Sequence, residues 1–309
     1  MSALAETIDL DAPPFGPGCV VRRNEPLARH TSMRVGGPAD LFCEVETEDA
    51  LAELLRWASA RDVPVFMLGG GTNLVVADAG VRGLTIKLGR SFARIEWVEE
   101  RDVARVVAGA SANFKRLVLE VTERGYSGLE FGEGIPGTVG GGVLMNAGAF
   151  GGEIANVVEA LRGVSRTGER RRLLRDELAF AYRRLDLPPG FVVTALEMRL
   201  VRDDPQAIAQ RIADAKRKRG RRQPLGLPNA GSIFKNPPGD FAGRLIELCG
   251  LKGKRVGGAQ VSPQHANFIV NTGGARAADV RALMDEIRDV VAQRCGVLLE
   301  PEVRLVGEW

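Results

Sequence analysis

Two rhythms of hydrophobic residues alternate along the chain. In the first, apolar residues recur three and four positions apart, which is the spacing of one face of an α-helix. It predicts helices over residues 49–61, 111–125, 205–219, 240–249 and 278–295. In the second, short apolar runs are bounded by Gly, Pro or charged residues, as in buried strands. It predicts strands over residues 41–45, 63–68, 74–76, 84–88, 93–98, 104–108, 157–164, 169–174, 191–200, 255–261, 267–271 and 297–306.

Several of these helices carry residues that stabilise helix ends. Ser111 is expected to cap the helix over residues 111–125, and Asp204, followed by Pro205, to cap the helix that begins the last third of the chain. Gly296 follows the last predicted helix and is typical of a helix C-terminus. Strands and helices alternate throughout, which indicates an α/β fold.

A chain of 309 residues is long enough for two or three domains, each with its own core. The order of the elements predicts a flexible tail over residues 1–18 and two α/β units over residues 19–89 and 90–203. The break at Asp204 predicts a third unit over residues 204–309.

Composition and charge exclude several classes of protein. Hydrophobic residues make up 45% of the sequence and charged residues 26%, which is ordinary for a globular protein, and the net charge of +3 does not demand a polyanionic partner. The first residues are acidic and lack the apolar core of a signal peptide. No run approaches the ~20 apolar residues that span a bilayer. We therefore expect a cytoplasmic protein without a membrane partner. We also expect the protein to be a monomer.

The residue types that bind metals are sparse. The four cysteines are scattered without a C-x-x-C motif, which favours reduced thiols over a disulfide framework or a zinc site. His30 and His265 are the only histidines in the sequence. We expect no metal site.

Residues 132–152 (GEGIPGTVGGGVLMNAGAFGG) contain nine glycines. Glycine in the interior of a helix or strand costs about 0.5–1 kcal/mol, so this stretch needs backbone freedom. Without a Cβ, the main chain can approach a large flat or phosphorylated ligand and direct its N–H groups at oxygen atoms. The loop over residues 68–73 (LGGGTN) has the same character. We expect the two loops to hold one elongated cofactor.

Other phosphate-binding motifs fit less well. Residues 132–137 match the pattern G-x-G-x-x-G of dinucleotide-binding βαβ units. However, Pro136 removes a backbone N–H there, and the glycines that follow are not helix-forming. The sequence also lacks the G-x-x-x-x-G-K-[ST] motif of nucleoside triphosphatases.

Two further polar stretches leave alternatives open. The basic run over residues 216–222 (KRKRGRR) is compatible with nucleic-acid binding or with a solvated helix end. No aromatic residues interleave with it for base stacking, so we expect no nucleic-acid partner. Residues 229–237 (NAGSIFKNP) combine a hydroxyl, an ammonium and two amides, as in a ligand site or a polar turn.

The end of the chain carries a third charged pattern. In an alternating strand over residues 300–304, Glu300, Glu302 and Arg304 would share one face. A carboxylate on an inward face is costly unless it is paired or used in chemistry.

Taken in order, the motifs of the chain resemble the UDP-N-acetylenolpyruvoylglucosamine reductase (MurB) family of bacterial cell-wall synthesis. They cover nearly all of the chain from about residue 20. The short connection between residues 183 and 191 is similar to the family's shorter type, which lacks an extra substrate-covering loop. The matching stretches are 31–40 (TSMRVGGPAD), 68–74 (LGGGTNL), 134–141 (GIPGTVGG), 145–149 (MNAGA), 230–237 (AGSIFKNP), 256–262 (VGGAQVS), 265–268 (HANF) and 299–304 (LEPEVR).

The resemblance implies a vanillyl-alcohol-oxidase-type FAD-binding fold of two α/β subdomains, followed by a C-terminal α/β substrate-binding domain. Neither glycine loop holds a histidine or cysteine for a covalent flavin link, so FAD is expected to bind noncovalently. By motif position, the expected cofactor-binding residues are Arg34, Gly69, Gly70, Gly71, Thr72, Asn73, Leu74, Gly134, Ile135, Pro136, Gly137, Thr138, Gly140, Gly141, Asn146, Ala147 and Gly148.

The resemblance also implies a reaction in two halves at one shared site. NADPH gives a hydride to the flavin, which passes it to the enolpyruvyl ether of UDP-N-acetylglucosamine to form UDP-N-acetylmuramate. Ser232 is the expected proton donor, with Arg183 and Glu302 stabilising the negative charge that develops. Glu302 would need a raised pKa to act as a hydrogen-bonding acid. The expected substrate-binding residues are Tyr182, Lys235, Asn236, Gln260 and His265.

The sequence departs from the family pattern at three positions. Leu185 stands where the family often has serine in Tyr-Arg-x-Ser, which bears on the choice of Arg183 over Arg184. Glu133 brings an acid, and Gly142 replaces a commoner alanine, in the flavin region. Two alternatives stay open, namely a flavin oxidase of the same fold acting on another small alcohol, and a flavin- or nucleic-acid-binding module without turnover.

Overall fold

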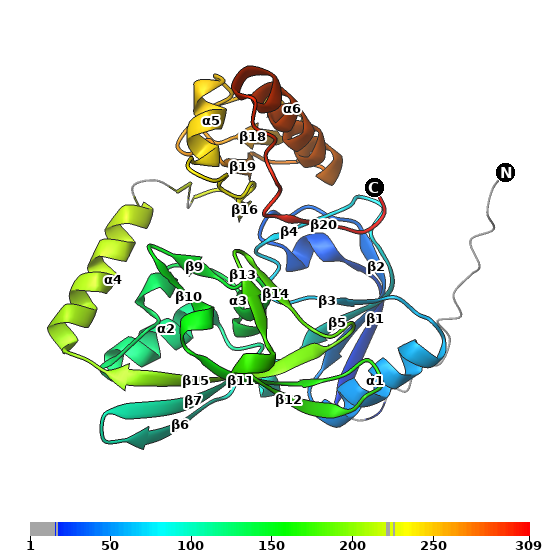
Figure 1. Cartoon of the computed structure of the whole chain (residues 1–309). Helices are drawn as coiled ribbons and strands as arrows, with labels where there is room; N and C mark the ends of the chain where they lie inside the picture. The colour runs from blue at the N-terminus through cyan, green and yellow to red at the C-terminus, as the bar shows by residue number, and fades with distance from the viewer. Residues whose placement is uncertain (1–15, 17, 221–222, 225) are drawn as a thin grey trace.

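The computed structural model describes residue 16 and residues 18–220, 223–224 and 226–309. The tail expected over residues 1–18 therefore lies almost entirely outside the described residues. In Figure 1, two strand-rich units lie side by side, and a third unit, coloured yellow to red, lies above them. Each unit contains both helices and strands, so the prediction of an α/β fold is confirmed.

The first unit is a four-stranded sheet with one long helix packed on it. The strand order is β1 (Cys19–Pro26), β2 (Pro38–Val45), β5 (Val81–Leu88) and β3 (Val65–Met67). β2, β5 and β3 run parallel, and β1 is antiparallel to β2. The apolar stripe of α1 (Glu48–Ala60) is buried together with β2 and β5. The sequence pattern does not predict β1, because most of its residues are exposed at the edge of the sheet.

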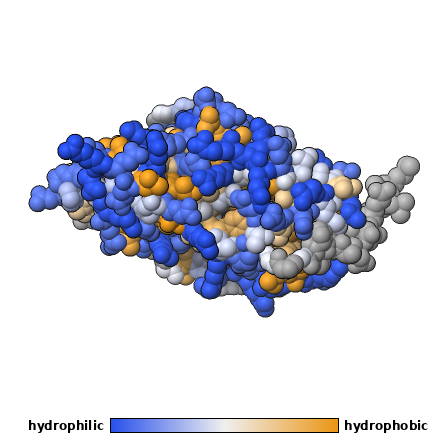
Figure 2. All heavy atoms as spheres, turned by 90° about the horizontal axis from the view of Figure 1, so that it is seen from below, coloured by the Kyte–Doolittle hydropathy of each residue, from blue (hydrophilic) through white to orange (hydrophobic). Residues whose placement is uncertain are grey.

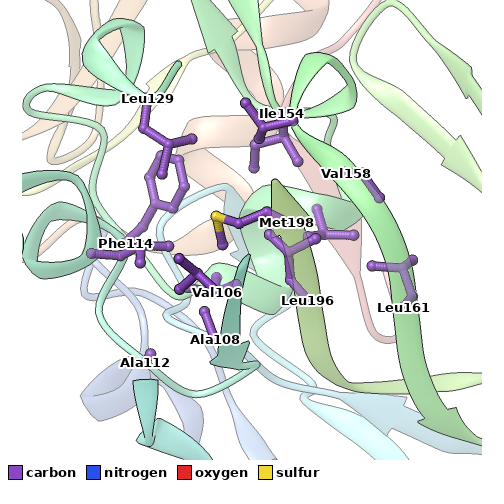
Figure 3. Packing of buried hydrophobic residues seen from close by; sticks show 14 of the residues in the cluster. Val106, Ala108, Ala112, Phe114, Leu129, Ile154, Val158, Leu161, Leu196 and Met198 are labelled. Atoms are coloured by element: carbon purple, nitrogen blue, oxygen red, sulfur yellow. The ribbon is translucent and has the colours of Figure 1, made fainter. Parts of the chain in front are cut away.

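The second unit is an antiparallel sheet of six strands. Its order is β12 (Arg170–Leu174), β11 (Val158–Val164), β15 (Val192–Arg202), β7 (Val103–Gly109) and β6 (Ile95–Glu100), and β8 (Tyr126–Ser127) pairs with β15. Figure 3 shows the core of this unit, in which Phe114 of α2 (Phe114–Glu123) lies near Val106 and Met198 of the sheet. Val139 and Val143 of the glycine-rich stretch are part of this core, so the stretch packs directly on the sheet.

The cap of α2 differs from the prediction. Asn113, not Ser111, precedes the helix, and its side chain accepts the backbone N–H of Arg116. The Ser111 hydroxyl instead donates to the Gly89 carbonyl oxygen at 2.6 Å. Periodicity locates the helix, but it does not fix its first residue to within two positions.

The glycine-rich stretch contains a short helix, α3 (Val139–Leu144), so the expectation that these residues do not form a helix is wrong. The Thr138 side chain caps it by accepting the backbone N–H of Gly141. A Cβ on Gly140 would lie 3.0 Å from the Ala110 Cβ, so glycine lets the helix pack closely on the chain that follows β7. The surrounding elements are η3 (Glu130–Gly132), β9 (Gly148–Ala149), β10 (Gly152–Glu153) and η4 (Ile154–Asn156).

A short hairpin follows β12 in the second unit. Its strands are β13 (Ala179–Ala181) and β14 (Arg184–Asp186), preceded by η5 (Arg175–Glu177). Tyr182 and Arg183 form its two-residue turn, and Arg183 has a φ of 57°. A non-glycine residue in the left-handed region is uncommon and often marks a functional constraint.

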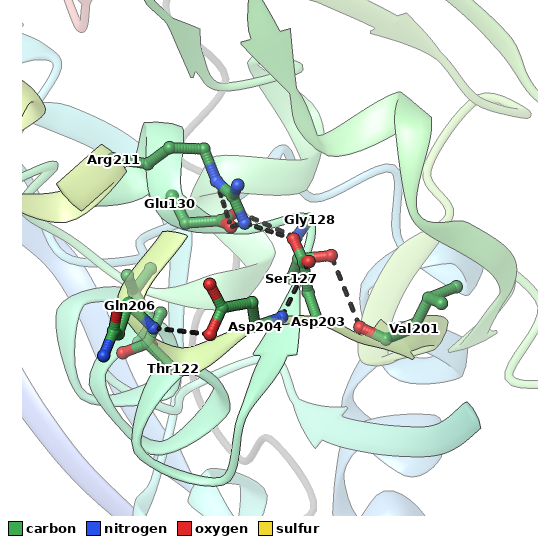
Figure 4. Close-up of polar contacts among 10 residues, drawn as sticks. Thr122, Ser127, Gly128, Glu130, Val201, Asp203, Asp204, Gln206 and Arg211 are labelled. Carbon is green, nitrogen blue, oxygen red and sulfur yellow. Dashed lines mark hydrogen bonds and ion pairs between the residues drawn. The ribbon is translucent and has the colours of Figure 1, made fainter. Parts of the chain in front are cut away.

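Helix α4 (Pro205–Gly220) connects the second unit to the third and is fastened at its start. As predicted, Asp204 caps it by accepting the Gln206 backbone N–H. Figure 4 shows Arg211 of this helix directed at Glu130, to which its Nε donates at 2.9 Å, and at Asp203. Because Glu130 also accepts the Gly128 N–H at 2.7 Å, α4 is tied to the segment before the glycine-rich stretch.

The third unit is a small antiparallel sheet with two helices. The strand order is β16 (Asn229–Ser232), β19 (Phe268–Asn271), β18 (Ala259–Val261) and β17 (Arg255–Val256), with α5 (Ala242–Leu248) and α6 (Ala277–Cys295) packed on it. Val280, Leu283 and Ile287 of α6 are buried in its core. Gly296 ends α6 in the left-handed conformation, as predicted.

Two strand predictions in this third are wrong in extent. Residues 255–261 form two short strands joined by a turn, in which Gly257 has a φ of 51°. Within residues 297–306, only β20 (Arg304–Val306) is a strand, and it pairs in parallel with β4 (Leu74–Val76) of the first unit. The chain thus returns to the first unit at its end, which carries Glu302 to the junction of the units.

The remaining elements are the 3-10 helices η1 (Leu27–His30) and η2 (Arg90–Ala93). On the face shown in Figure 2, hydrophilic residues predominate and hydrophobic atoms show in small groups between them, the usual pattern of a water-exposed surface. Among the helices of the described residues, none has both the length and the apolar composition to cross a lipid bilayer.

Candidate active site

A cavity of about 570 Å³ is lined by residues from all three units, a size typical of small-molecule sites. One wall consists of the two glycine loops, and a second wall carries charged and polar side chains. The predicted cofactor-binding residues that line it are Gly69, Gly70, Gly71, Thr72, Asn73, Leu74, Gly134, Ile135, Pro136, Gly137, Thr138, Gly141, Ala147 and Gly148.

The two glycine loops touch each other through their main chains. A Cβ on Gly70 would lie 2.7 Å from the Gly137 Cα, and the Thr72 hydroxyl donates to the Pro136 carbonyl oxygen at 3.3 Å. Gly71 has a φ of 62°, and a Cβ there would lie 2.0 Å from the His30 carbonyl oxygen. The loops therefore form a narrow cradle in which main-chain groups are close to any ligand, which fits an elongated cofactor with a pyrophosphate.

Three predicted cofactor-binding residues do not line this cavity. Arg34 is exposed and has a φ of 57°. Gly140 is buried inside α3 against Ala110. Asn146 is buried, donates to the Ala181 carbonyl oxygen and accepts the Ala155 N–H, so its side chain ties the glycine-rich stretch to the β13–β14 hairpin.

Arg183 and Glu302 form an ion pair on the second wall. The Arg183 Nε lies 2.9 Å from the Glu302 Oε1, and both side chains are about four-fifths buried, with exposures of 20% and 17%. Among the described residues, the buried Nε–H finds no well-aligned hydrogen bond, so the attraction is mainly that of opposite charges. The left-handed turn places the Arg183 guanidinium at the cavity, whereas Arg184 pairs with Asp186 on the exposed side of β14.

Burial raises the pKa of the Glu302 carboxyl, although Arg183 and Lys235 oppose the shift by favouring the charged form. The backbone around it is fixed, since the Glu302 N–H donates to the Ile233 carbonyl oxygen at 2.8 Å. The Asn73 side chain donates to the Glu302 carbonyl oxygen at 3.1 Å. The carboxyl group is thus held at the meeting point of the first and third units.

Ser232 lies at the end of β16 and lines the same cavity. Within the part of the chain that the structure describes, its hydroxyl makes no hydrogen bond. Gly231 before it has a φ of 76° and interrupts the pairing of β16 with β19. The hydroxyl is therefore available to a bound molecule.

The five residues expected to bind substrate lie outside the cavity lining. Tyr182 is half exposed beside the Arg183 guanidinium, whose Cζ is 5.0 Å from its ring centre. Lys235 pairs with Glu300 at 2.5 Å. The other three bond to the main chain of the third unit: Asn236 accepts the Ala242 N–H, Gln260 donates to the Gly253 carbonyl oxygen, and His265 Nδ1 accepts the Asn267 N–H.

Several cavity residues are not predicted from the sequence, among them Phe150, Arg219, Phe268 and Arg304. Arg219 belongs to the basic run noted in the sequence, but the spacing of that run does not show which of its residues faces inward.

The departure from the family pattern at Leu185 has an explanation, because this residue is buried in the core of the second unit, where a serine hydroxyl would need a partner. In the described part of the chain, no cluster of three or more His, Cys, Asp or Glu residues could hold a metal ion.

The chain is similar to known proteins over most of its length. A family model described as the C-terminal domain of UDP-N-acetylenolpyruvoylglucosamine reductase matches residues 223–306, and one described as an FAD-binding domain matches residues 39–174. A UDP-N-acetylenolpyruvoylglucosamine reductase of Symbiobacterium thermophilum is 49% identical over 288 residues, covering 93% of this chain and 92% of the relative. The chain belongs to the UDP-N-acetylenolpyruvoylglucosamine reductase (MurB) family.

Further relatives agree with this assignment. The reductase of Geobacter metallireducens is 48% identical over 288 residues, or 93% of this chain and 94% of the relative. The crystal structure of the Thermus caldophilus reductase has a TM-score of 0.80 and 38% identity, covering 93% of this chain and 98% of that one. The resemblance read from the motifs is confirmed, as is the expected architecture of an FAD-binding α/β part followed by a MurB C-terminal part.

Proposed function

We propose that this chain is the FAD-dependent reductase that uses NADPH to convert UDP-N-acetyl-3-O-(1-carboxyvinyl)-glucosamine into UDP-N-acetylmuramate, a cell-wall precursor. Family membership supports the reaction. The observation in the molecule that carries the proposal is the convergence of Arg183, Ser232 and Glu302 on a cavity whose other wall is the glycine cradle. The five residues predicted to bind substrate stay proposals: Tyr182 lies on the β13–β14 turn of the second unit, and the other four lie in the third unit.

The cradle fits noncovalent FAD, with the main chain of residues 69–73 and 134–138 next to the cofactor. The chemistry that bound FAD would supply is hydride transfer, from NADPH to the terminal alkene carbon of the substrate. The protein's task is to bind and orient both substrates there and to exclude water. No side chain of the cradle carries a charge, so its contacts are mainly to backbone groups.

Hydride addition makes the enolpyruvyl group electron-rich and moves negative charge toward its carboxylate. Arg183 stabilises that charge through its planar guanidinium. Burial raises the pKa of Glu302 and so favours uptake of a proton at this carboxyl, and in its protonated form Glu302 donates a hydrogen bond to the same group. The Ser232 hydroxyl gives its proton to the carbon next to the carboxylate and regains one from solvent, which completes the addition of two hydrogens across the double bond.

An anaerobic absorbance titration tests the proposal. NADPH is added to the purified, FAD-loaded protein, followed by the enolpyruvyl substrate, while the oxidised flavin band is followed. We expect bleaching by NADPH and recovery on addition of substrate without oxygen. Recovery with oxygen alone would favour the alternative of a flavin oxidase, and a protein that cannot be loaded with FAD would exclude both enzymes.

The cellular setting belongs to the same proposal. A cytoplasmic location follows from the expectation drawn from composition, and a monomeric state is proposed with it. The division into units at residues 19–89, 90–203 and 204–309 is also proposed, with one addition, the return of β20 to β4. Light scattering of the purified protein measures the oligomeric state directly.

A further inference from the structure

In the basic run over residues 216–222, Arg219 faces the cavity, whereas the residues before it face solvent. Arg217 pairs with Asp214 on the exposed side of α4, and Lys216 is exposed. Arg219 instead turns inward and lines the cavity. Residues 221–222 lie outside the described part of the chain. The function proposed above gives Arg219 no role.

The Arg219 guanidinium is partly buried and poorly bonded. Its Nε is inaccessible and makes no hydrogen bond within the described residues, and its Nη1 reaches the Gln223 Oε1 only at 3.4 Å. Burial lowers the pKa of this guanidinium, Glu133 partly restores it, and Arg183 lowers it further. A buried, poorly bonded cation is costly, so a site that retains one is suited to an anion.

Neighbouring residues hold the guanidinium in place. Its Cζ lies 5.7 Å from the centre of the Phe150 ring, at the tip of the β9–β10 hairpin. A Cβ on Gly134 would lie 2.8 Å from the Arg219 Cδ, so glycine leaves room for the arginine stem. Glu133, which departs from the family pattern, lies close enough to favour the charged form of Arg219, although the two make no ion pair within 4.0 Å.

The cavity as a whole has more positive than negative charge. Its described lining carries the charges of Arg183, Arg219 and Arg304 against that of Glu302. Arg183 is already paired with Glu302. Within this described lining, Arg219 is therefore a partly buried cation without an ion-pair partner, in a cavity whose field favours a ligand with two negative charges.

We propose that Arg219 binds the diphosphate of the nucleotide-sugar substrate. The identity of this ligand rests on the proposed function. A guanidinium matches phosphate oxygens in bidentate geometry. Arg219 lies outside residues 39–174, which match the FAD-binding domain, on the helix that leads to the third unit. This placement assigns it to the exchangeable substrate rather than to FAD.

The test compares UDP with uridine, because the two ligands differ only in the diphosphate. Their dissociation constants are measured by calorimetry on the FAD-loaded protein, for the wild type, for Arg219→Gln and for the control Arg217→Gln. We expect Arg219→Gln to weaken UDP binding about 10- to 100-fold while uridine binding stays within about twofold. Arg217→Gln, on the exposed side of the same helix, should leave both constants unchanged.

One further variant sharpens the result. Arg219→Lys keeps the charge and should restore part of the preference for UDP. Equal loss of UDP and uridine affinity in Arg219→Gln, or loss of FAD with UDP affinity unchanged, would overturn the proposal. Turnover is not needed for this measurement, so a protein that binds UDP through Arg219 but does not reduce the enolpyruvyl substrate would refute the proposed function alone.

Discussion

The two walls of the cavity are built in opposite ways. The glycine cradle consists of two short continuous segments, residues 69–73 and 134–138, whose main chains touch. The charged wall consists of side chains brought from far apart in the sequence, Arg183, Ser232 and Glu302. The shape of the glycine cradle requires residues without a Cβ, so that the main chains can approach closely. The function of the charged wall requires a few side-chain atoms held at defined distances.

This difference determines how each wall should respond to substitution. In the cradle, adding one methyl group should affect folding and cofactor binding together, since neighbouring main chains cannot move aside cheaply. On the charged wall, exchanging a charged group for a neutral one of similar size should leave the fold intact and affect chemistry. The predictions below test this contrast, beginning with the largest effect.

The largest effect is expected from Gly71→Ala. The new Cβ would lie 2.0 Å from the His30 carbonyl oxygen, on a residue with a φ of 62°. We expect a loss of about 3 kcal/mol in unfolding free energy and little bound FAD, measured by thermal denaturation and by flavin content. Gly151→Ala is the matched control, because Gly151 also has a positive φ but no atom within 4 Å of the place that the new methyl group would take; it should cost about 1 kcal/mol and retain FAD.

Glu302→Gln should separate the two halves of the reaction. Reduction of the flavin by NADPH does not use this acid and serves as the internal control. Reoxidation by the enolpyruvyl substrate should slow by a factor of about 10² to 10⁴, because the buried acid is replaced by a weaker hydrogen-bond donor. Stopped-flow absorbance measures both steps, and an unchanged reoxidation rate would remove Glu302 from the chemistry.

Arg183 and Arg184 form a natural pair of variants. Arg183→Gln removes the guanidinium that faces the cavity and should slow substrate reduction about 10²-fold. Arg184→Gln removes only an exposed pair with Asp186 and should change the rate less than about twofold. If Arg184→Gln proved the more damaging in steady-state assays, the assignment by geometry would have to be reversed.

The smallest effect concerns pH. The folded-state pKa of Glu302 is raised, so the carboxyl contributes stability fully below its unfolded pKa and loses it as pH rises through the folded value. The wild type should therefore lose stability relative to Glu302→Gln across this window, as followed by denaturant titration at several pH values. Reoxidation by substrate should fall over the same rise in pH, since the neutral acid is the form that donates. A stability difference independent of pH would show that Glu302 has an ordinary pKa.

Local patterns predicted much of the fold. The amphipathic helices α1, α2, α4 and α6 follow from apolar spacing, and the strands of the second sheet follow from their buried runs. The exceptions share a cause. β1 is an exposed edge, and α3 is a glycine-rich helix held by the Thr138 cap and close packing. Residues 297–303 lie against the third unit with one isolated bridge, between Pro301 and Phe234, in place of a strand. In each case, contacts distant in sequence override the local preference.

By itself, the sequence determined the family and the glycine cradle, because both rest on contiguous motifs whose chemistry is local. The tertiary structure alone decided which arginine of Tyr182-Arg183-Arg184 faces the cavity, that Arg219 leaves the basic run to enter it, and that Glu302 meets Arg183 where β20 returns to β4. The Arg183–Glu302 pair depends on charges that are far apart in the chain. The inward position of Arg219 depends on which face of α4 is buried. Burial and the distances between these charges are set only when the three units pack together, so local sequence patterns do not predict them.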